Sequence, residues 1–240
     1  MASKVMALIT ARGGSVGLKN KNILPLAGKP VLAWTVTAAR AATLVDRVVV
    51  STDSDAIAAV ARTWGAEVPF MRPEELATST ASHNSVIMHA VDTMAREENY
   101  HPDYLLLLQP TSPLRTAADI DAAIRLARES DCDGVVSVCA VHNHPLLMNR
   151  IDADGFLTGY LPDRPLPGSE AVRRQNLPPA YADNGAIYLV RTAKLRQYGS
   201  LRVPRTRAYI MPEQCSFQID SQWELELIEY LLTRKETSRP

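Results

Sequence analysis

The sequence predicts an α/β fold with a mostly parallel sheet, and three observations lead to it. Short apolar or β-branched runs alternate with segments of helical periodicity through the first half of the 240 residues. Residues 104–108 are apolar throughout, which is typical of a strand buried on both faces of a parallel sheet. A glycine-rich loop follows the first strand, at the edge where such sheets bind their ligands. Strands that alternate with helices imply crossover connections that cover both faces of the sheet.

Each expected element has its own signal along the chain. β-Branched or apolar runs predict strands at residues 4–10, 47–51, 67–70, 104–108, 134–138 and 185–190. Apolar residues at helical spacing predict helices at residues 31–42, up to about residue 64, up to residue 96, at 116–129 and at about 221–234. The expected helix caps are Asp53 or Ser54, Ser82 or Asn84, Thr116, and Ser221 with Glu224 in a capping box.

Composition and charge exclude several classes of protein. Lys plus Arg equals Asp plus Glu, at 26 each, so no overall field draws the chain to nucleic acid or to a membrane. Cys132, Cys139 and Cys215 are dispersed and odd in number, which argues against a zinc site or a disulfide framework. No signal-peptide core and no apolar stretch near the roughly 20 residues of a membrane span is present. We therefore expect a cytoplasmic protein.

The glycine-rich loop is the strongest functional signal. Three glycines let the backbone approach a ligand closely, and successive exposed amides form a concave anion site. Arg12, Lys19 and Lys21 add positive charge, and the combination suits the phosphates of a nucleotide. The alternative is a solvated basic turn, because the loop matches neither a Walker A motif nor the dinucleotide fingerprint. The loop has the sequence Ala11-Arg12-Gly13-Gly14-Ser15-Val16-Gly17-Leu18-Lys19-Asn20-Lys21-Asn22.

A second polar segment, residues 109–115, follows the most apolar strand. Two prolines stiffen the turn, so that Gln109, Thr111 and Ser112 hold fixed positions at the edge of the sheet. Their neutral donors and acceptors suit sugar hydroxyls, and Arg115 is a candidate structural anchor. The alternative is a connection whose prolines only shape the approach to the next helix.

The pattern of alternating strands and helices stops between residues 140 and 183. Six prolines break this stretch into short pieces, and residues 152–155 (Asp-Ala-Asp-Gly) predict a hairpin turn. The stretch is too long for a plain loop in a compact domain, so we expect an insertion with a role of its own. Residues 1–139 and 184–240 then form the main domain.

Five ordered segments together resemble one known family. They are residues 11–22, residues 72–82, residues 109–115, residues 174–178 (Arg-Gln-Asn-Leu-Pro) and residues 184–188 (Asn-Gly-Ala-Ile-Tyr). In this order they look like the acylneuraminate cytidylyltransferases, also called CMP-sialic acid synthetases. The similarity covers nearly the whole chain.

The resemblance implies a fold and a reaction. The fold is a Rossmann-like nucleotidyltransferase sandwich with a dimerisation insertion, residues 140–183, which also contributes to the sugar site. The anomeric hydroxyl of a nine-carbon α-keto acid sugar (a nonulosonic acid) attacks the α-phosphate of CTP and releases pyrophosphate. The resemblance also implies a homodimer whose partners are CTP and the sugar. The balanced charge predicts no role for nucleic acid or a membrane.

The resemblance also assigns residues to sites. It implies nucleotide binding by Ala11, Arg12, Gly13, Gly14, Ser15, Lys21, Asn22, Arg72, Ala81 and Ser82. It implies sugar contacts from Gln109 and Tyr188, while Arg174 suits a two-point grip on the sugar carboxylate. Thr111 and Ser112 join this set as neutral polar neighbours, and His83 is expected to border the nucleotide.

Arg12, Lys21 and Asp220 are the candidate catalytic residues. Phosphoryl transfer depends mainly on positioning and on fixed charge around the phosphates. Mg²⁺ usually bridges phosphates and is held by one or two carboxylates, and Asp220, just before the last helix, is the candidate ligand. The alternative role for Asp220 is an acidic residue placed favourably at a helix N-terminus.

Three residues depart from the family pattern. Val16 stands where family members commonly have Lys, and Lys19 is the nearest replacement. Gln218 stands where they commonly have the first Asp of Asp-x-Asp, which puts a second metal in doubt. Leu147 lies near where some sialic acid enzymes carry Lys, so the sugar need not be sialic acid itself.

Two rival functions remain open. One is CMP transfer to an eight-carbon keto sugar acid, which the sequence of residues 109–115 makes less favoured. The other is a catalytically weakened nucleotide-binding domain, motivated by Val16 and Gln218.

Overall fold

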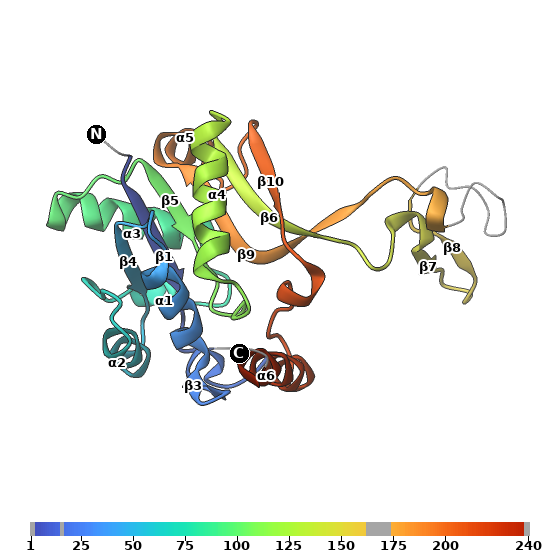
Figure 1. Ribbon diagram of the computed structural model, residues 1–240, viewed down its shortest axis with the longest axis horizontal. Helices are drawn as coiled ribbons and strands as arrows, with labels where there is room; N and C mark the ends of the chain where they lie inside the picture. Colours follow the sequence, from blue (N-terminus) through green and yellow to red (C-terminus); the bar gives the residue numbers. More distant parts are fainter. Residues whose placement is uncertain (1–2, 15–16, 162–173, 238–240) are drawn as a thin grey trace.

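The computed structural model describes residues 3–14, 17–161 and 174–237, apart from the side chains of 174 and 235–237. Its centre is a six-stranded sheet in the order β10-β6-β9-β5-β1-β4 (Figure 1). The strands are β1 (Val5–Thr10), β4 (Arg47–Ser51), β5 (Tyr104–Leu107), β6 (Gly134–Ala140), β9 (Tyr181–Arg191) and β10 (Thr206–Ile210). All neighbours are parallel except β9, which runs antiparallel to both β5 and β6. The predicted α/β class is confirmed.

Helices cover both faces of the sheet. They are α1 (Val31–Ala41), α2 (Asp55–Thr63), α3 (His83–Glu98), α4 (Ala117–Glu129), α5 (Thr192–Tyr198) and α6 (Gln222–Thr237). Alternate residues of β1 point to opposite faces: Val5 and Ile9 pack in one core with α1, α2 and α4, while Met6 and Leu8 pack in the other with α3 and α5. A strand buried on both sides needs apolar residues at every position, which explains its sequence.

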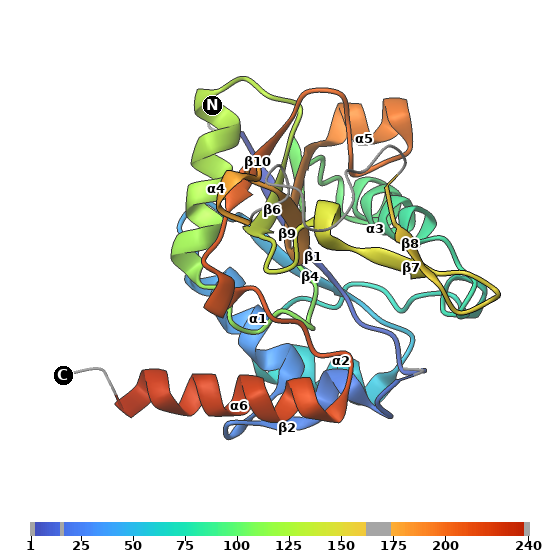
Figure 2. The ribbon, with the colours of Figure 1, turned by 90° about the vertical axis from the view of Figure 1, so that its right-hand side faces the viewer.

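A third apolar cluster holds the last helix against the main body. Leu225 and Ile228 of α6 are buried with Leu26 of the short strand β2 (Pro25–Leu26), which pairs with β3 (Lys29–Pro30). Figure 2 shows α6 lying beneath the body beside β2. This packing fixes the segment that precedes α6, where Asp220 lies.

The predicted caps form at three helices. Ser54 accepts a hydrogen bond from the Ile57 amide at 3.5 Å and caps α2. Thr116 and Asp119 form a full capping box on α4. The Ser221 amide donates to Glu224 at 2.7 Å, and the Glu224 amide donates back to the Ser221 hydroxyl at 3.4 Å, so the last helix also has its box.

Some expected elements differ from the structure. The strand predicted at residues 67–70 is wrong, because Glu67 makes only an isolated bridge to Val49. β9 begins at Tyr181, four residues before the expected strand, since it continues pairing with β6 outside the main body. α5, β10 and the β2–β3 hairpin had no clear signal in the sequence.

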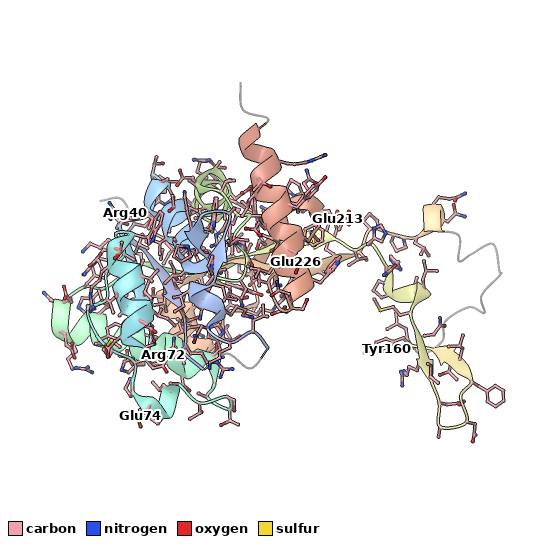
Figure 3. The ribbon with its side chains drawn as sticks, turned by 90° about the horizontal axis from the view of Figure 1, so that it is seen from below. Arg40, Arg72, Glu74, Tyr160, Glu213 and Glu226 are labelled. Atoms are coloured by element: carbon pink, nitrogen blue, oxygen red, sulfur yellow. The ribbon has the colours of Figure 1, made fainter. Side chains whose placement is uncertain are left out.

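The described part of residues 140–183 forms an arm that projects from the body (Figure 1). Its base is the outer end of the β6–β9 ladder, where Ala140 pairs with Tyr181. Farther out lies the hairpin of β7 (Asn149–Ile151) and β8 (Leu157–Gly159). Its turn is the predicted one, and the Asp152 carboxylate accepts from the Phe156 amide at 2.8 Å. Figure 3 shows Tyr160 on this arm, well apart from the body.

No helix among the described residues is long and apolar enough to cross a membrane.

Candidate functional site

Two neighbouring cavities lie at the carboxyl ends of β1 and β5, where the parallel sheet was expected to bind its ligand. The first cavity has a volume of about 360 Å³ and the second about 310 Å³. Thr10, Arg12 and His83 line both of them, so the two join at these residues. The first is also lined by Gly17, Lys21, Asn22, Gln109, Pro110, Thr111, Gln218 and Asp220, and the second by Arg72, Leu76, Thr78, Ser79, Ala81 and Val86.

Two cations and one carboxylate converge on the first cavity. Lys21 Nζ donates to the Ile219 carbonyl at 2.9 Å and to Asp220 Oδ1 at 3.1 Å. The Lys21 side chain is 18% exposed and that of Asp220 is 69% exposed, so the carboxylate is free to meet a further ligand. Arg12 donates to the Thr78 carbonyl at 3.0 Å and carries its charge to the junction of the cavities. The structure therefore brings all three candidate catalytic residues together.

Two side chains, those of Asp53 and Asn22, hold the backbone of the glycine loop. The Gly13 amide donates to Asp53 Oδ1 at 3.0 Å, and the buried Asn22 donates to the Arg12 carbonyl at 3.0 Å. A Cβ at Gly17 would lie 3.0 Å from the Asp220 carbonyl oxygen, so the loop approaches Asp220 as closely as glycine allows. Gly14 is exposed, with open space around its Cβ position, and of the three loop glycines only Gly17 lines a cavity. Ser15 and Val16 lie outside the described residues.

Lys19 is the nearest candidate to replace the loop lysine that is absent at Val16. It is exposed and lines neither cavity, whereas Lys21 lines the first. Ala11 is buried and its amide donates to the Ser51 carbonyl at 3.0 Å, so it anchors the start of the loop on β4.

Arg72 forms part of the wall of the second cavity. Its Nε donates to Ser51 Oγ at 3.1 Å and a terminal nitrogen donates to the Ser51 carbonyl at 2.6 Å. Burial lowers the pKa of Arg72; the carboxylate of Asp53 acts in the opposite direction, and the charge of Arg12 lowers the pKa further. Figure 3 shows Arg72 at the edge of the body near Glu74. Its position at the end of β4 makes it a rigid positive group beside this cavity.

The start of α3 lies at the junction of the cavities. Ala81 lines the second cavity, while Ser82 is exposed at the cap position of α3 and lines neither. His83 Nε2 and Thr10 Oγ1 share a hydrogen bond of 3.0 Å. Burial lowers the pKa of His83, and the charge of Arg72 lowers it further, so the neutral ring is favoured.

The segment after β5 divides its residues between the cavity and the core. Gln109 and Thr111 line the first cavity. Ser112 points the other way: it is 1% exposed and donates to the Asn184 carbonyl at 3.5 Å, so it supports the turn and does not reach a sugar. Arg115 is the predicted anchor, with bonds to the Ala186 carbonyl at 2.5 Å and to the Thr35 hydroxyl at 2.8 Å.

Two expected sugar contacts lie away from the cavities. Tyr188 is half-buried on β9 and packs in the apolar core beside α3 and α5, and it lines neither cavity. Burial raises its pKa, the charge of Asp183 raises it further, and Arg202 opposes the rise. The backbone of Arg174 starts a short 3-10 turn (Arg174–Asn176) on the arm, and its side chain lies outside the described residues.

Several contacts were not apparent from the sequence. The Ile219 amide donates to the Thr111 carbonyl at 2.9 Å and ties the Asp220 segment to the turn after β5. A Cβ at Gly185 would lie 2.6 Å from the amide of Gln218, and Gly185 has a φ of +70°. Thr10 also lines both cavities, and its place at the end of the first strand was the available signal.

The residues at the first cavity could hold one metal ion. Among the described residues no three His, Cys, Asp or Glu side chains form a cluster. Asp220 offers one carboxylate and Gln218 one neutral oxygen, which fits Mg²⁺ that takes its remaining ligands from phosphates and water.

The fold and this site define a class of protein. A mostly parallel sheet carries a cationic glycine loop at the end of β1, close to Asp220, the one carboxylate among the described residues that lines the first cavity, as nucleotidyltransferases do. Residues 6–237 match the sequence profile of the family described as Cytidylyltransferase. The chain belongs to this family and is a nucleotidyltransferase that resembles the CMP-nonulosonic acid synthetases.

Bacterial relatives match almost the whole chain. It is 31% identical to the post-translational flagellin modification protein B of Campylobacter coli, over 97% of each protein. It is 34% identical to the CMP-N,N'-diacetyllegionaminic acid synthase of Legionella pneumophila, over 95% of this chain and 96% of that one. It is also 34% identical to the N-acylneuraminate cytidylyltransferase of Escherichia coli, where 95% of this chain spans only 52% of the longer relative.

Solved structures share the fold at low sequence identity. A CMP:2-keto-3-deoxy-manno-octonic acid synthetase complexed with CTP superposes with a TM-score of 0.69 at 18% identity, over 97% of this chain and 100% of that one. A 4-diphosphocytidyl-2C-methyl-D-erythritol synthase of Anaerococcus prevotii gives 0.66 at 12% identity, over 98% and 100%.

Proposed function

We propose that this protein transfers CMP from CTP to a nonulosonic acid and releases pyrophosphate. The observation that carries the proposal is the convergence of Arg12, Lys21 and Asp220 on one cavity. Relatives named for sialic and legionaminic acids, at 34% identity over 95% of the chain, support a nine-carbon sugar acid as the acceptor.

The two cavities suit the two ends of a nucleoside triphosphate. The first offers Arg12, Lys21 and the backbone at Gly17 to the phosphates. The second is smaller, and Arg72 and Ala81 line it beside apolar Leu76 and Val86, as a planar base requires. The junction between them then receives the ribose.

The chain's residues contribute mainly charge and position to the reaction. The anomeric oxygen of the sugar forms a bond to the α-phosphorus of CTP and loses its proton, while the bond from that phosphorus to the β-phosphate oxygen breaks. Negative charge grows on the departing pyrophosphate, and Arg12 and Lys21 provide fixed positive charge beside it. Gln109 and Thr111 offer neutral hydrogen bonds to hold the sugar in line.

Mg²⁺ is the metal that this site would take. Asp220 would hold it together with the carbonyl oxygen of the Gln218 amide. Bound there, the ion would neutralise charge on the phosphates. A single carboxylate supports one protein-held metal ion, with Lys21 close enough to balance Asp220 when the metal is away.

The arm is proposed to pair two copies of the chain. It exposes large apolar side chains on its hairpin, including Ile151 at 73%, Phe156 at 70% and Leu157 at 70%. Contiguous exposed apolar surface is typical of an interaction site. A homodimer formed through the arm would bring Arg174 near a sugar site.

The test is incubation of the protein with CTP, Mg²⁺ and a panel of nonulosonic acids, with an eight-carbon keto sugar acid as comparison. We expect pyrophosphate release and a CMP adduct, seen by mass spectrometry, with at least one nine-carbon acid. If only the eight-carbon acid is turned over, the acceptor is that acid and not a nonulosonic acid. Tight CTP binding without turnover on any sugar would instead identify a nucleotide-binding domain.

A further inference from the structure

His83 lies at the junction of the two cavities, together with two other polar residues. Among the described residues, only Thr10, Arg12 and His83 line both cavities, whereas Lys21 lines the first and Arg72 the second. A nucleotide with its phosphates in the first cavity and its base in the second must pass its ribose over these three residues. The inference below rests on that proposed placement of CTP.

The hydrogen bond to Thr10 leaves one ring nitrogen of His83 for a ligand. Thr10 Oγ1 and Nε2 lie 3.0 Å apart, and His83 makes no other hydrogen bond within the described residues. A neutral imidazole has one donor and one acceptor nitrogen, so Nδ1 keeps whichever role Nε2 does not use. A ribose hydroxyl both donates and accepts, and it can pair with Nδ1 in either case.

The other two junction residues are less suited to this task. Arg12 already donates to the carbonyl of Thr78, a residue of the second cavity, at 3.0 Å. The hydroxyl of Thr10 is engaged by His83. Burial and the charge of Arg72 favour the uncharged ring of His83, which avoids a third positive charge next to Arg12 and Arg72.

We propose that His83 is a specificity-determining residue that holds one ribose hydroxyl of the bound nucleotide through Nδ1. The side chain thereby distinguishes a ribonucleotide from its deoxy counterpart. The bond of 3.0 Å to Thr10 holds the ring at the junction, and the next residue, Asn84, ties the start of α3 to the Gly199 carbonyl at 2.6 Å.

Two variants distinguish the contribution of Nδ1 from that of Nε2. The amide of His83→Asn replaces Nδ1 and gives up the bond to Thr10, whereas the amide of His83→Gln reaches the position of Nε2 and gives up Nδ1. His83→Ala removes both, and Ser85→Ala, an exposed residue of the same helix that lines neither cavity, is the control. Each protein is titrated by calorimetry with CTP, 2′-deoxy-CTP and 3′-deoxy-CTP, and its melting temperature is recorded.

We expect the parent chain and His83→Asn to prefer CTP over one of the two deoxynucleotides. His83→Gln and His83→Ala should lose about fivefold or more in CTP affinity and bind that deoxynucleotide as the parent does. Equal losses for all three nucleotides, or a parent chain that does not distinguish them, would overturn the role of His83. No binding of CTP by the parent chain would overturn the proposed function as well, which separates the two failures.

Discussion

At the scale of single residues, the pairing of Lys21 with Asp220 connects the two halves of the proposed reaction. The lysine comes from the loop after β1 and the carboxylate from the segment before α6, almost two hundred residues later. Their contact of 3.1 Å leaves each side chain within reach of the same ligand. In the proposed complex Lys21 would contact the triphosphate and Asp220 would contact the metal ion.

Lys21→Ala should lower kcat/KM by about a hundredfold or more, because it removes a fixed positive charge that stabilises the departing phosphate. Lys19→Ala is the matched control, since Lys19 is exposed and outside both cavities. Initial rates of pyrophosphate release measure both variants. Equal effects of the two substitutions would show that Lys21 does not act on the phosphates.

Asp220→Asn should weaken metal binding more than nucleotide binding, because it removes the one carboxylate that lines the first cavity in the described part of the chain. The cap of α6 is unaffected, since Ser221 and Glu224 form it. Binding of Mn²⁺ in the presence of CTP, followed by electron paramagnetic resonance, measures the loss. Unchanged Mn²⁺ affinity would place the metal elsewhere.

At the scale of elements, β9 shapes the site through its glycine. Gly185 has a φ of +70° and lies against the amide of Gln218, so a side chain there would displace Gln218 from the cavity. Gly199, which ends α5 with a φ of +60°, has open space around its Cβ position. A side chain at either glycine would be strained by the positive φ. Only a side chain at Gly185 would also clash with Gln218.

Gly199→Ala should cost about 1–2 kcal/mol of the free energy of unfolding, as a left-handed L-residue does. Gly185→Ala should cost more than this and should also lower activity, because Gln218 must move. Urea unfolding and initial rates measure the pair. Full activity in Gly185→Ala would show that the position of Gln218 does not matter.

The loop between α1 and β4 is held by Asp121 of α4. Burial alone would raise the pKa of Asp121, but donors from the Thr43 amide and hydroxyl and the Leu44 amide outweigh it, so its pKa lies below the usual range. The folded state therefore favours the carboxylate. This contribution to stability is present above the unfolded pKa, near 3.9, and is lost as the pH falls through the lower folded value.

Asp121→Asn should therefore be less stable than the parent at pH 6, and the difference should narrow as the pH falls toward 3. Glu129→Gln, an exposed position on the same helix, is the control. The free energy of unfolding across this range measures the effect. A difference that stays constant with pH would show that charge on Asp121 contributes nothing.

At the scale of the whole molecule, the arm stands apart from the body and exposes its apolar hairpin. Phe156→Glu combined with Leu157→Glu should convert a dimer to a monomer, because both side chains are 70% exposed in the single chain. The body should keep its melting temperature, since neither residue contacts its core. Sedimentation velocity measures the change, and a parent chain that sediments as a monomer would contradict the proposed pairing.

Much of this architecture could be predicted from the sequence. The buried strands and the capped helices carry strong local signals, and the parallel order placed the glycine loop and the segment after β5 at one edge. The edge strand β10 was not predicted because none of its five residues is fully buried, and residues 67–70 lack the neighbours that would make them a strand. Ser112 was misplaced because spacing alone does not tell which way a side chain points from a proline-rich turn.

A crystal structure of the protein with CTP and Mn²⁺ is the most direct test of the shared cavity. Anomalous scattering would locate the metal ion without reference to the protein chain. The account predicts the triphosphate between Arg12 and Lys21, the metal ion beside Asp220 and the base against Arg72 and Ala81. A triphosphate bound outside the first cavity, or a metal ion distant from Asp220, would contradict it.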